Sequence, residues 1–441
     1  MVKLNFKSPS NYIAELKSVL KNRGSLLREG MWVFVGQITT VIVGLTTLRV
    51  VTELIPPNVF GEASLWLGIV ALLRNVFISP ISNFQIRFYP KFKTQNYLQY
   101  FNSVILNYYK NAFVYSIIVF IVTIYILILF KVIIIPVFFP LALILYYFSD
   151  ILKSNYLNKL SAERKQFLFA IWTIVDAVLI FILIVIGLSV EGTSFSYIAS
   201  QALGILLVTL VFIPVTKKSL TISESFQGQY SGNIFSEFKK YGLPFIPMAV
   251  IVWLLTLGNR YILTLYGSLL QVGIFTAAFS IASRPFIFFS GITAIFFRPI
   301  LFQAESEKNT IKAKSIIQVW FAVIIVISIF ILIFLGFGGN LIAEIFLAKN
   351  YHSNLTVLFI TIGSGFLFQS IFQVIENRFF SFEKSKLVLY CNIISAIAFL
   401  ISNIYFISNY GMVGAGIAIA VTYLAQLLIG LYFLRAQKYS K

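Results

Sequence analysis

The sequence predicts an all-α polytopic membrane protein with about twelve transmembrane helices arranged as two pseudo-symmetric six-helix lobes. Composition is the first reason: of 441 residues, 59% are hydrophobic and only 11% are charged, whereas soluble proteins carry roughly 25% charged residues. The second reason is a series of apolar runs of about 20 residues, the length that crosses a hydrocarbon core of roughly 30 Å. The third is a pattern of charges and glycines that recurs in both halves of the chain.

Twelve apolar runs can be placed along the chain, separated by turn residues or charges. They cover residues 31–54, 62–83, 112–130, 132–152, 167–188, 195–215, 244–266, 270–296, 315–336, 355–376, 387–408 and 411–434. The division within 112–152 rests only on Lys131 and two prolines. A single span there would invert the orientation of every later loop.

Lysine and arginine residues are distributed asymmetrically about these spans. If both termini are cytoplasmic, the inward segments hold 28 of the 34 Lys and Arg residues, and the outward loops hold only Lys131 and Lys349. Positive charges favour the cytoplasmic side, so we expect a multi-pass protein with both termini inside. The net charge of +19 then reflects topology at an anionic lipid surface, and we expect no nucleic-acid partner because the basic residues form no single stripe.

A polar connector divides the predicted spans into two sets of six. We expect a cytoplasmic amphipathic segment over 1–30, an N-lobe with helices 1–6 over 31–215, a cytoplasmic connector over 216–243, a C-lobe with helices 7–12 over 244–434, and a cytoplasmic tail over 435–441. Within the first segment, apolar residues recur at helical spacing among basic ones, a pattern typical of a helix lying on a membrane surface.

The two predicted lobes share a pattern of arginine, glycine and proline. The matching series are Arg49, Gly61, Arg74, Arg87 and Pro90 in the first half and Arg260, Gly273, Arg284, Arg298 and Pro299 in the second. An even number of spans per lobe gives both lobes the same orientation, so a duplication would place a substrate path between them. Chance is the alternative, because no identity beyond these positions is evident.

Two arginines of the predicted C-lobe lie on polar faces of their helices. Arg260 has Thr256 and Thr264 four residues to either side, and Arg284 has Ser280 four residues before it. A charge in the middle of a span costs at least ~2.5 kcal/mol, so we expect these arginines to face a protein cavity rather than lipid.

Arg74 also lacks an acidic residue at helical spacing, and we interpret it as a third cavity residue. The alternative for all three is a salt bridge between helices with Asp176, which lies near the middle of the fifth span. Arg49 differs because Glu53 follows four residues later. For Arg49 an intrahelical ion pair, or a side chain extended to the outer surface, competes with a place in the cavity.

The acidic residues within the spans are few. Asp176 is either a partner for one arginine or a group that couples transport to protons or sodium ions. Two others stand beside basic residues at inner helix ends and are interpreted as interfacial ion pairs; they are Asp150, beside Lys153, and Glu376, beside Arg378.

A cavity lined by three or four arginines and few acids would hold an anion, because guanidinium groups match phosphate oxygens bidentately. No phosphate-binding loop for ATP is present, so transport would be secondary. Cys391 and His352 are the single cysteine and histidine, which predicts no metal site. No pair of carboxylates and no serine–histidine arrangement supports an enzyme.

Three segments carry a resemblance to a known family. They are LTTLRVVTELIPPNVFGEASLWLGIVALL, YGLPFIPMAVIVWLLTLGNRYILTLYGSLLQVGIFTAAFSIAS and YGMVGAGIAIAVTYLAQLLIGLYFL. They resemble the Wzx-type flippases of polysaccharide biosynthesis, which belong to the MOP superfamily together with the MATE multidrug exporters and the lipid II flippases. The resemblance covers essentially the whole chain, and its most specific part is the Gly-Leu-Pro, Asn-Arg and Val-Gly-Ile pattern of the seventh and eighth spans.

The resemblance implies a MATE-like fold whose two lobes alternate between inward-open and outward-open V shapes. It implies transfer of a polyprenyl-pyrophosphate-linked oligosaccharide, such as an O-antigen (lipopolysaccharide) or capsule repeat unit, from the cytoplasmic to the outer leaflet of the inner membrane. The cationic residues that would bind the substrate here are Arg49, Arg74, Arg260 and Arg284, with Thr256, Thr264 and Ser280 lining the same cavity.

The resemblance further implies coupling to a proton or sodium gradient, for which Asp176 is the candidate, and no other cofactor. Expected partners are membrane lipids, glycosyltransferases and a polysaccharide polymerase, around a functional monomer. Two alternatives stay open. A MATE-like exporter of drugs or metabolites would have the same fold, and a non-transporting membrane scaffold of polysaccharide synthesis would leave the buried arginines paired with acids.

Overall fold

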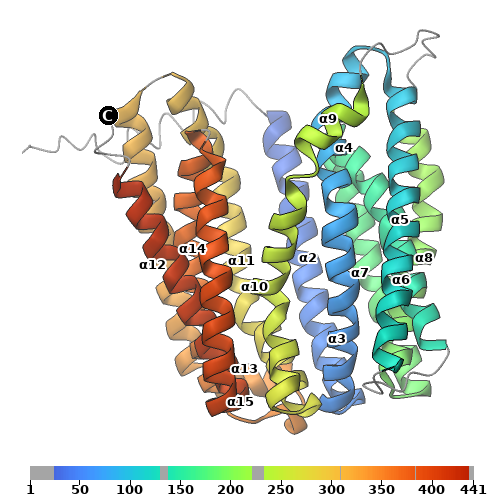
Figure 1. Cartoon of the computed structure of the whole chain (residues 1–441), viewed down its shortest axis with the longest axis vertical. Coiled ribbons are helices and arrows are strands. Elements are labelled where there is room, and N and C mark those ends of the chain that lie inside the picture. The colour runs from blue at the N-terminus through green and yellow to red at the C-terminus, as the bar shows by residue number, and fades with distance from the viewer. Residues whose placement is uncertain (1–23, 130–137, 221–232, 308, 383, 437–441) are drawn as a thin grey trace, which may run out of the picture.

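The computed structural model describes residues 24–129, 138–220, 233–307, 309–382 and 384–436, and every regular element in these ranges is a helix (Figure 1). The elements of the first half are α2 (Gly24–Leu54), α3 (Pro57–Leu73), the π-helical turn η1 (Arg74–Ile78), α4 (Ser79–Thr94), α5 (Leu98–Leu129), α6 (Phe138–Ala162), α7 (Gln166–Val190) and α8 (Ser194–Ser219). Because η1 joins α3 to α4 without a break, these three elements form one long rod.

The second half is also helical throughout its described residues. Its elements are α9 (Ile234–Tyr241), α10 (Phe245–Tyr266), α11 (Leu269–Ser306), α12 (Thr310–Phe337), α13 (Gly339–Phe346), the 3₁₀ turn η2 (Lys349–Tyr351), α14 (Leu355–Ser381) and α15 (Ser385–Ala436). Inside α15, Gly411 has a φ of 55°, a conformation that glycine adopts without steric cost. This kink separates the two spans predicted over 387–408 and 411–434.

Ten helical stretches in the described ranges are long and apolar enough to cross a membrane. One of them, Lys386–Ala436, contains both predicted spans of α15. α6 is not among the ten, because polar residues such as Asp150 and Lys153 lower its hydropathy. The chain is therefore a multi-pass membrane protein. The predicted separation of 112–130 from 132–152 is confirmed, since α5 ends at Leu129 and α6 begins at Phe138.

Some predicted boundaries are displaced. α2 begins at Gly24, inside the segment predicted to lie on the membrane surface; the surface helix itself was predicted mostly over residues 1–23, outside the described ranges. α8 continues to Ser219, and α9 lies within the predicted connector 216–243. The Asn233 side chain begins α9 by accepting a hydrogen bond from the Ser236 backbone N–H, the usual cap of a helix start.

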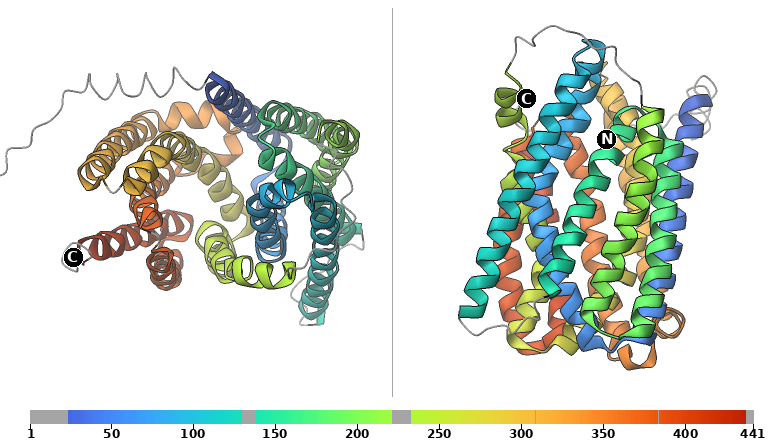
Figure 2. Two further views of the ribbon diagram at one scale, coloured as in Figure 1. Left: turned by 90° about the horizontal axis from the view of Figure 1, so that it is seen from above. Right: turned by 90° about the vertical axis from the view of Figure 1, so that its right-hand side faces the viewer.

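The helices gather into two groups (Figures 1 and 2). In the first half α2, α6, α7 and α8 pack together with α4 and α5, and in the second half α10, α11, α12, α14 and α15 pack together. The two groups meet where α3 contacts α10 and α11. A large buried cluster crosses this boundary, since Val51 and Phe60 of the first half pack with Val272 and Phe275 of the second.

The two ends of the molecule carry different segments. α9 and the C-terminal end of α15 lie at the top of Figure 1, whereas α13 lies at the bottom. In the predicted topology, α9 belongs to an inward segment and α13 to an outward loop. The end that carries α13 is called the outer end below.

Candidate functional site

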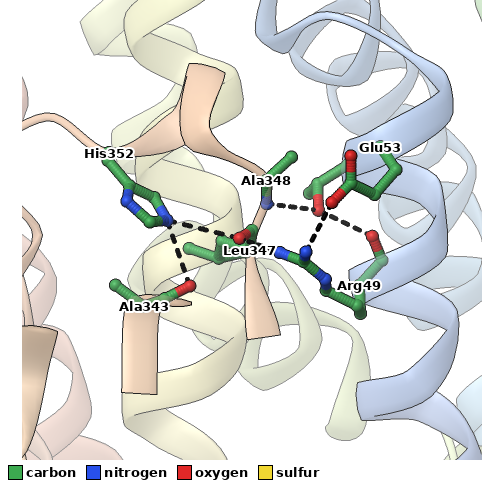
Figure 3. A network of polar contacts seen from close by, with 7 residues as sticks. Arg49, Glu53, Ala343, Leu347, Ala348 and His352 are labelled. Carbon is green, nitrogen blue, oxygen red and sulfur yellow. Dashed lines mark hydrogen bonds and ion pairs between the residues drawn. The ribbon is translucent and has the colours of Figure 1, made fainter. Parts of the chain in front are cut away.

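Arg49, near the end of α2, has its charge and its hydrogen-bonding capacity occupied (Figure 3). Its Nη2 lies 2.5 Å from Glu53 Oε1 on the same helix, and its Nη1 donates to the Leu347 carbonyl oxygen beyond α13. The intrahelical ion pair predicted from the four-residue spacing is confirmed. The contact with Leu347, almost 300 residues away, could not be read from local spacing.

Arg74 is the first residue of η1, and its Nε lies 2.6 Å from Asp150 Oδ2 on α6. Its Nη2 also donates to Ser154 Oγ at 3.4 Å. The expectation that Arg74 would be unpaired or bound to Asp176 is therefore wrong. The actual partner stands on another helix, where helical spacing within one segment gives no signal.

Asp176 on α7 is buried and pairs with Lys153 of α6, whose Nζ lies 2.7 Å from Asp176 Oδ2. The prediction that Asp176 could be an arginine's partner is wrong. The second carboxylate oxygen, Oδ1, is buried without a hydrogen-bond partner among the described residues. Its place as an ion-coupling group stays a prediction.

The two interfacial pairs predicted between sequence neighbours are also wrong. Lys153 is bound to Asp176 rather than to Asp150, and Arg378 pairs with Glu305 of α11 rather than with Glu376. Glu376 and Arg378 are two residues apart, a spacing at which side chains do not face each other on a helix. Lys153 lies three residues from Asp150, but the pair with Asp176 of the adjacent helix forms instead.

Arg260 lies half-buried on α10 and has no acidic partner among the described residues. Its guanidinium carbon stands 5.6 Å from the centre of the Phe279 ring, within the range of a cation–π interaction. Its Nε is buried without a hydrogen-bond partner. The guanidinium therefore keeps unused hydrogen-bonding capacity.

The two threonines predicted to line the cavity beside Arg260 do not offer free hydroxyl protons to a ligand. Thr256 donates to the Val252 carbonyl at 2.7 Å and Thr264 to the Arg260 carbonyl at 2.8 Å. These hydroxyl protons are thus used within the helix backbone, as is common for threonine in transmembrane helices. Neither threonine lines the two cavities described next.

Arg284 of α11 reaches across to the first half of the chain. Its Nη1 would lie 3.0 Å from a Cβ placed on Gly44 of α2, so the absence of a side chain there leaves room for the guanidinium. Nη1 is buried and has no hydrogen-bond partner in the described part of the chain. Arg284 is thus a half-buried cation that remains available at the boundary between the two groups of helices.

A cavity of about 230 Å³ with both polar and apolar lining residues, called the polar cavity below, adjoins Arg284 between α2, α3, α7, α8 and α11. Its polar lining residues are Thr40, Thr47, Tyr197, Gln201, Ser280 and Arg284. The prediction named only the last two. Thr40, Gly44 and Thr47 repeat at four- and three-residue spacing, and this small polar stripe was the sequence signal that could have located α2 in the cavity wall.

An apolar cavity of about 640 Å³ also adjoins Arg284, between α2 and α11–α13. Arg284 is the one charged or polar side chain among its lining residues. Several lining residues also face outward, since Ile42 is 59% exposed, Val326 67% and Phe330 71%. In a membrane protein such surfaces contact lipid tails, so this cavity opens toward the bilayer.

The arrangement resembles solved transporters. No family model and no curated protein matches the sequence. An inward-facing multidrug resistance MATE family transporter of the MOP superfamily matches with a TM-score of 0.69 at 15% identity, over 91% of this chain and 95% of that chain. The lipid II flippase MurJ in an inward closed conformation matches with 0.66 at 14%, over 93% and 87%. A point mutant of the Vibrio cholerae MATE transporter VcmN matches with 0.65 at 14%, over 96% and 98%.

These similarities show the fold. The chain has the all-α, MATE-like fold of MOP-superfamily transporters, as predicted. Of the solved structures named here, two are described as MATE transporters and one as a lipid II flippase; that the chain catalyses no reaction stays a prediction.

Proposed function

We propose that the chain is a flippase for an amphiphile with an anionic head and a long apolar tail. The observation that carries this proposal is the position of Arg284, an unpaired, half-buried cation where a polar cavity meets an apolar, lipid-facing one in the described part of the chain. A polyprenyl-pyrophosphate-linked oligosaccharide has an anionic, an apolar and a neutral polar part that correspond to these three features of the site. Its pyrophosphate fits a guanidinium group bidentately, its prenyl chain suits the apolar cavity, and its first sugar suits neutral hydrogen-bonding side chains.

Energetics support a ligand at Arg284. A buried charge is costly unless it is paired, and Arg49 and Arg74 meet this need with Glu53 and Asp150. Arg260 and Arg284 have no acidic ion-pair partner among the described residues. The phosphate of an incoming substrate would neutralise their charge. The two C-half arginines are therefore the substrate-binding candidates that we retain from the original four.

The proposal also includes the expected family, membrane location, partners and ion coupling of the protein. The protein would be a Wzx-type flippase of the inner membrane with both termini cytoplasmic, acting as a monomer beside glycosyltransferases and a polysaccharide polymerase. Transport would be secondary, with Asp176 binding a proton or sodium ion in exchange for Lys153. The resemblance to the lipid II flippase MurJ supports an amphiphilic substrate.

The test uses a strain that lacks the protein and carries plasmid-borne variants. Arg284→Gln should leave lipid-linked oligosaccharide on the cytoplasmic side and reduce surface polysaccharide at least about tenfold, the effect expected when a charge-assisted hydrogen bond worth ~1.5–3 kcal/mol is lost. The matched control is Arg435→Gln, at the exposed end of α15. Normal surface polysaccharide in the deletion strain, with new sensitivity to cationic drugs, would instead indicate a MATE-like exporter. Normal polysaccharide with both Arg260 and Arg284 replaced by Gln would contradict the cationic site.

A further inference from the structure

One face of α3 meets the second half of the chain along the outer part of the molecule. The residues on this face are Gly61, Ser64, Leu65 and Gly68, spaced three, four and seven positions from the first. Such spacing places them in one row on a helix. Small residues in the row let the helices approach closely, as at other membrane helix interfaces.

The tightest approach joins the two glycines that the repeat pattern had matched. A Cβ on Gly61 would collide with the Leu269 carbonyl oxygen and the Gly273 backbone, and a Cβ on Gly273 would collide with the backbone of Pro57. Both obstacles are backbone atoms, which cannot turn aside as a side chain can. α3 and α11 therefore fit together in this state only because neither position carries a side chain.

Three hydrogen bonds continue the row. Ser64 and Thr276 hydroxyls lie 3.3 Å apart. The Tyr261 hydroxyl donates to the Leu65 carbonyl at 2.7 Å, and the Trp253 indole N–H donates to the Gly68 carbonyl at 2.7 Å. We call these eight residues the outer seam: Gly61, Ser64, Leu65 and Gly68 of α3 with Trp253, Tyr261, Gly273 and Thr276.

A second set of contacts lies at the outer end beside the seam (Figure 3). Arg49 donates to the Leu347 carbonyl, and the Ala348 N–H donates to Thr52 Oγ1 at 3.1 Å. The Tyr351 hydroxyl donates to the Ile55 carbonyl at 3.0 Å. The end of α2 is thus bound to the segment between α13 and α14, which belongs to the second half.

Three of the acceptors in these contacts keep another partner when the contacts separate. The carbonyls of Leu65 and Gly68 lie inside α3, where the backbone N–H four residues later also donates to each. The Leu347 carbonyl lies 3.2 Å from His352 Nε2 in addition to Arg49. Arg49 keeps Glu53 on its own helix, so its charge stays compensated when α2 moves away. An unmade hydrogen bond is what makes polar interfaces costly to open; here these acceptors keep a partner, and the donors Trp253, Tyr261 and Tyr351 exchange a carbonyl for the water that enters the opened end.

The ion pairs inside the first half behave differently. Arg74 with Asp150 and Lys153 with Asp176 join elements within one group of helices. Breaking either pair would leave a largely buried carboxylate, Asp150 or Asp176, without its counter-charge. The contacts of the outer seam are thus neutral, and Arg49 keeps its counter-charge Glu53 on its own helix, whereas these two ion pairs have both charges inside the first group of helices.

We propose that Arg49 is a gating residue rather than a substrate ligand, and that the outer seam and the Arg49 contacts close the outer end and part together during each transport cycle. This inference rests on the proposed function in assuming transport, but not on the identity of the substrate. It assigns Gly61 and Gly273 a role as a steric interlock of the closed state.

The experiment measures access to the seam in the full-length protein in oriented membrane vesicles or intact cells. In a background with the buried Cys391→Ala replacement, Thr276→Cys places a thiol at a position that is only 5% exposed. A membrane-impermeant maleimide is applied from the outer side. The labelling rate reports how often the seam is open and requires no substrate.

Gly273→Ala in this background should raise the labelling rate about tenfold, because overpacking costs of roughly 1–3 kcal/mol would disfavour the closed state. Gly291→Ala on the same helix is the matched control, since a Cβ there meets nothing within 4 Å, and it should label at the parental rate. Arg49→Gln should also label faster, by about tenfold for one lost charge-assisted hydrogen bond. This second variant keeps the test valid if Gly273→Ala fails to insert.

The outcomes separate the two proposals. Unchanged labelling in both Gly273→Ala and Arg49→Gln would overturn the gating inference, even if polysaccharide export proves normal. Unchanged labelling in Arg49→Gln together with abolished export would show that Arg49 acts as a ligand, and would equally overturn it. Faster labelling in both variants would support the gate even if the transported molecule proves not to be a lipid-linked oligosaccharide.

Discussion

Arg74 Nε lies 2.6 Å from Asp150 Oδ2, and this ion pair joins the π-helical turn η1 to α6. Asp150 is 9% exposed, so removing Arg74 would leave a largely buried carboxylate without its counter-charge. The pair explains how an arginine is held inside a membrane span without a ligand.

We expect Arg74→Gln and Asp150→Asn each to lower the free energy of unfolding of the purified protein in detergent, by about 1–3 kcal/mol because the remaining group loses its partner. The double variant should lose less than the sum of the two single variants, since the two charges disappear together. Thermal unfolding of the four proteins measures this coupling. Strictly additive losses would show that the pair contributes nothing.

The fit between Gly44 and Arg284 predicts a second result. Gly44→Ala would place a Cβ 3.0 Å from Arg284 Nη1, so the guanidinium must shift from its position beside the polar cavity. We expect surface polysaccharide to fall about three- to tenfold, as for a crowded packing site. Gly30→Ala on the same helix should be silent, because a Cβ there meets nothing within 4 Å. Equal effects of the two replacements would indicate a general disturbance of α2.

If Asp176 is the ion-coupling group, its replacement should affect the coupling of transport to an ion gradient but not the binding of substrate. If a proton or sodium ion displaces Lys153 from Asp176, Asp176→Asn should abolish the dependence of transport on an ion gradient while substrate exchange without a gradient continues. Transport into vesicles with and without imposed proton and sodium gradients measures this. Asp150→Asn serves as the control for loss of a carboxylate on a neighbouring helix. Gradient-driven transport that survives in Asp176→Asn would remove Asp176 from the coupling mechanism.

Glu163, in the turn between α6 and α7, predicts a dependence of stability on pH. Its carboxylate accepts from the Tyr89 hydroxyl at 2.8 Å and lies 2.9 Å from Lys165 Nζ. Burial by itself would raise the pKa of Glu163, but the hydrogen bonds from Lys165 and Tyr89 outweigh it and hold the pKa below the usual 4.5. The depressed pKa means that the stabilisation is present above pH 4.5 and is lost as the pH falls through the native pKa.

Glu163→Gln should therefore be less stable than the parent at neutral pH, and the difference should shrink as the pH falls below 4.5. Thermal unfolding between about pH 3 and pH 7 measures this, over the range in which carboxylates titrate. A difference that stays constant across this range would show that the carboxylate charge has no role there.

The fold was largely predictable because its signals are local. Apolar runs long enough to cross a bilayer identified the spans, and the four-residue spacing of Arg49 and Glu53 identified their ion pair. The matched positions of Gly61 and Gly273 also indicated that the two halves correspond, although the sequence could not show that these two glycines pack together. The site was less predictable, since Arg74 and Asp176 find their partners on α6, and no pattern within one helix reports a contact with another.

The sequence by itself determined that the chain is helical, that it crosses a membrane many times and that a few arginines lie inside its spans, because hydropathy and periodicity act over neighbouring residues. Only the tertiary structure decided which arginines remain unpaired. Arg74 is bound by Asp150 of another helix, while Arg284 stands between two cavities. The physical reason is that the cost of a buried charge depends on the groups that packing brings within a few ångströms, and these come from distant parts of the chain.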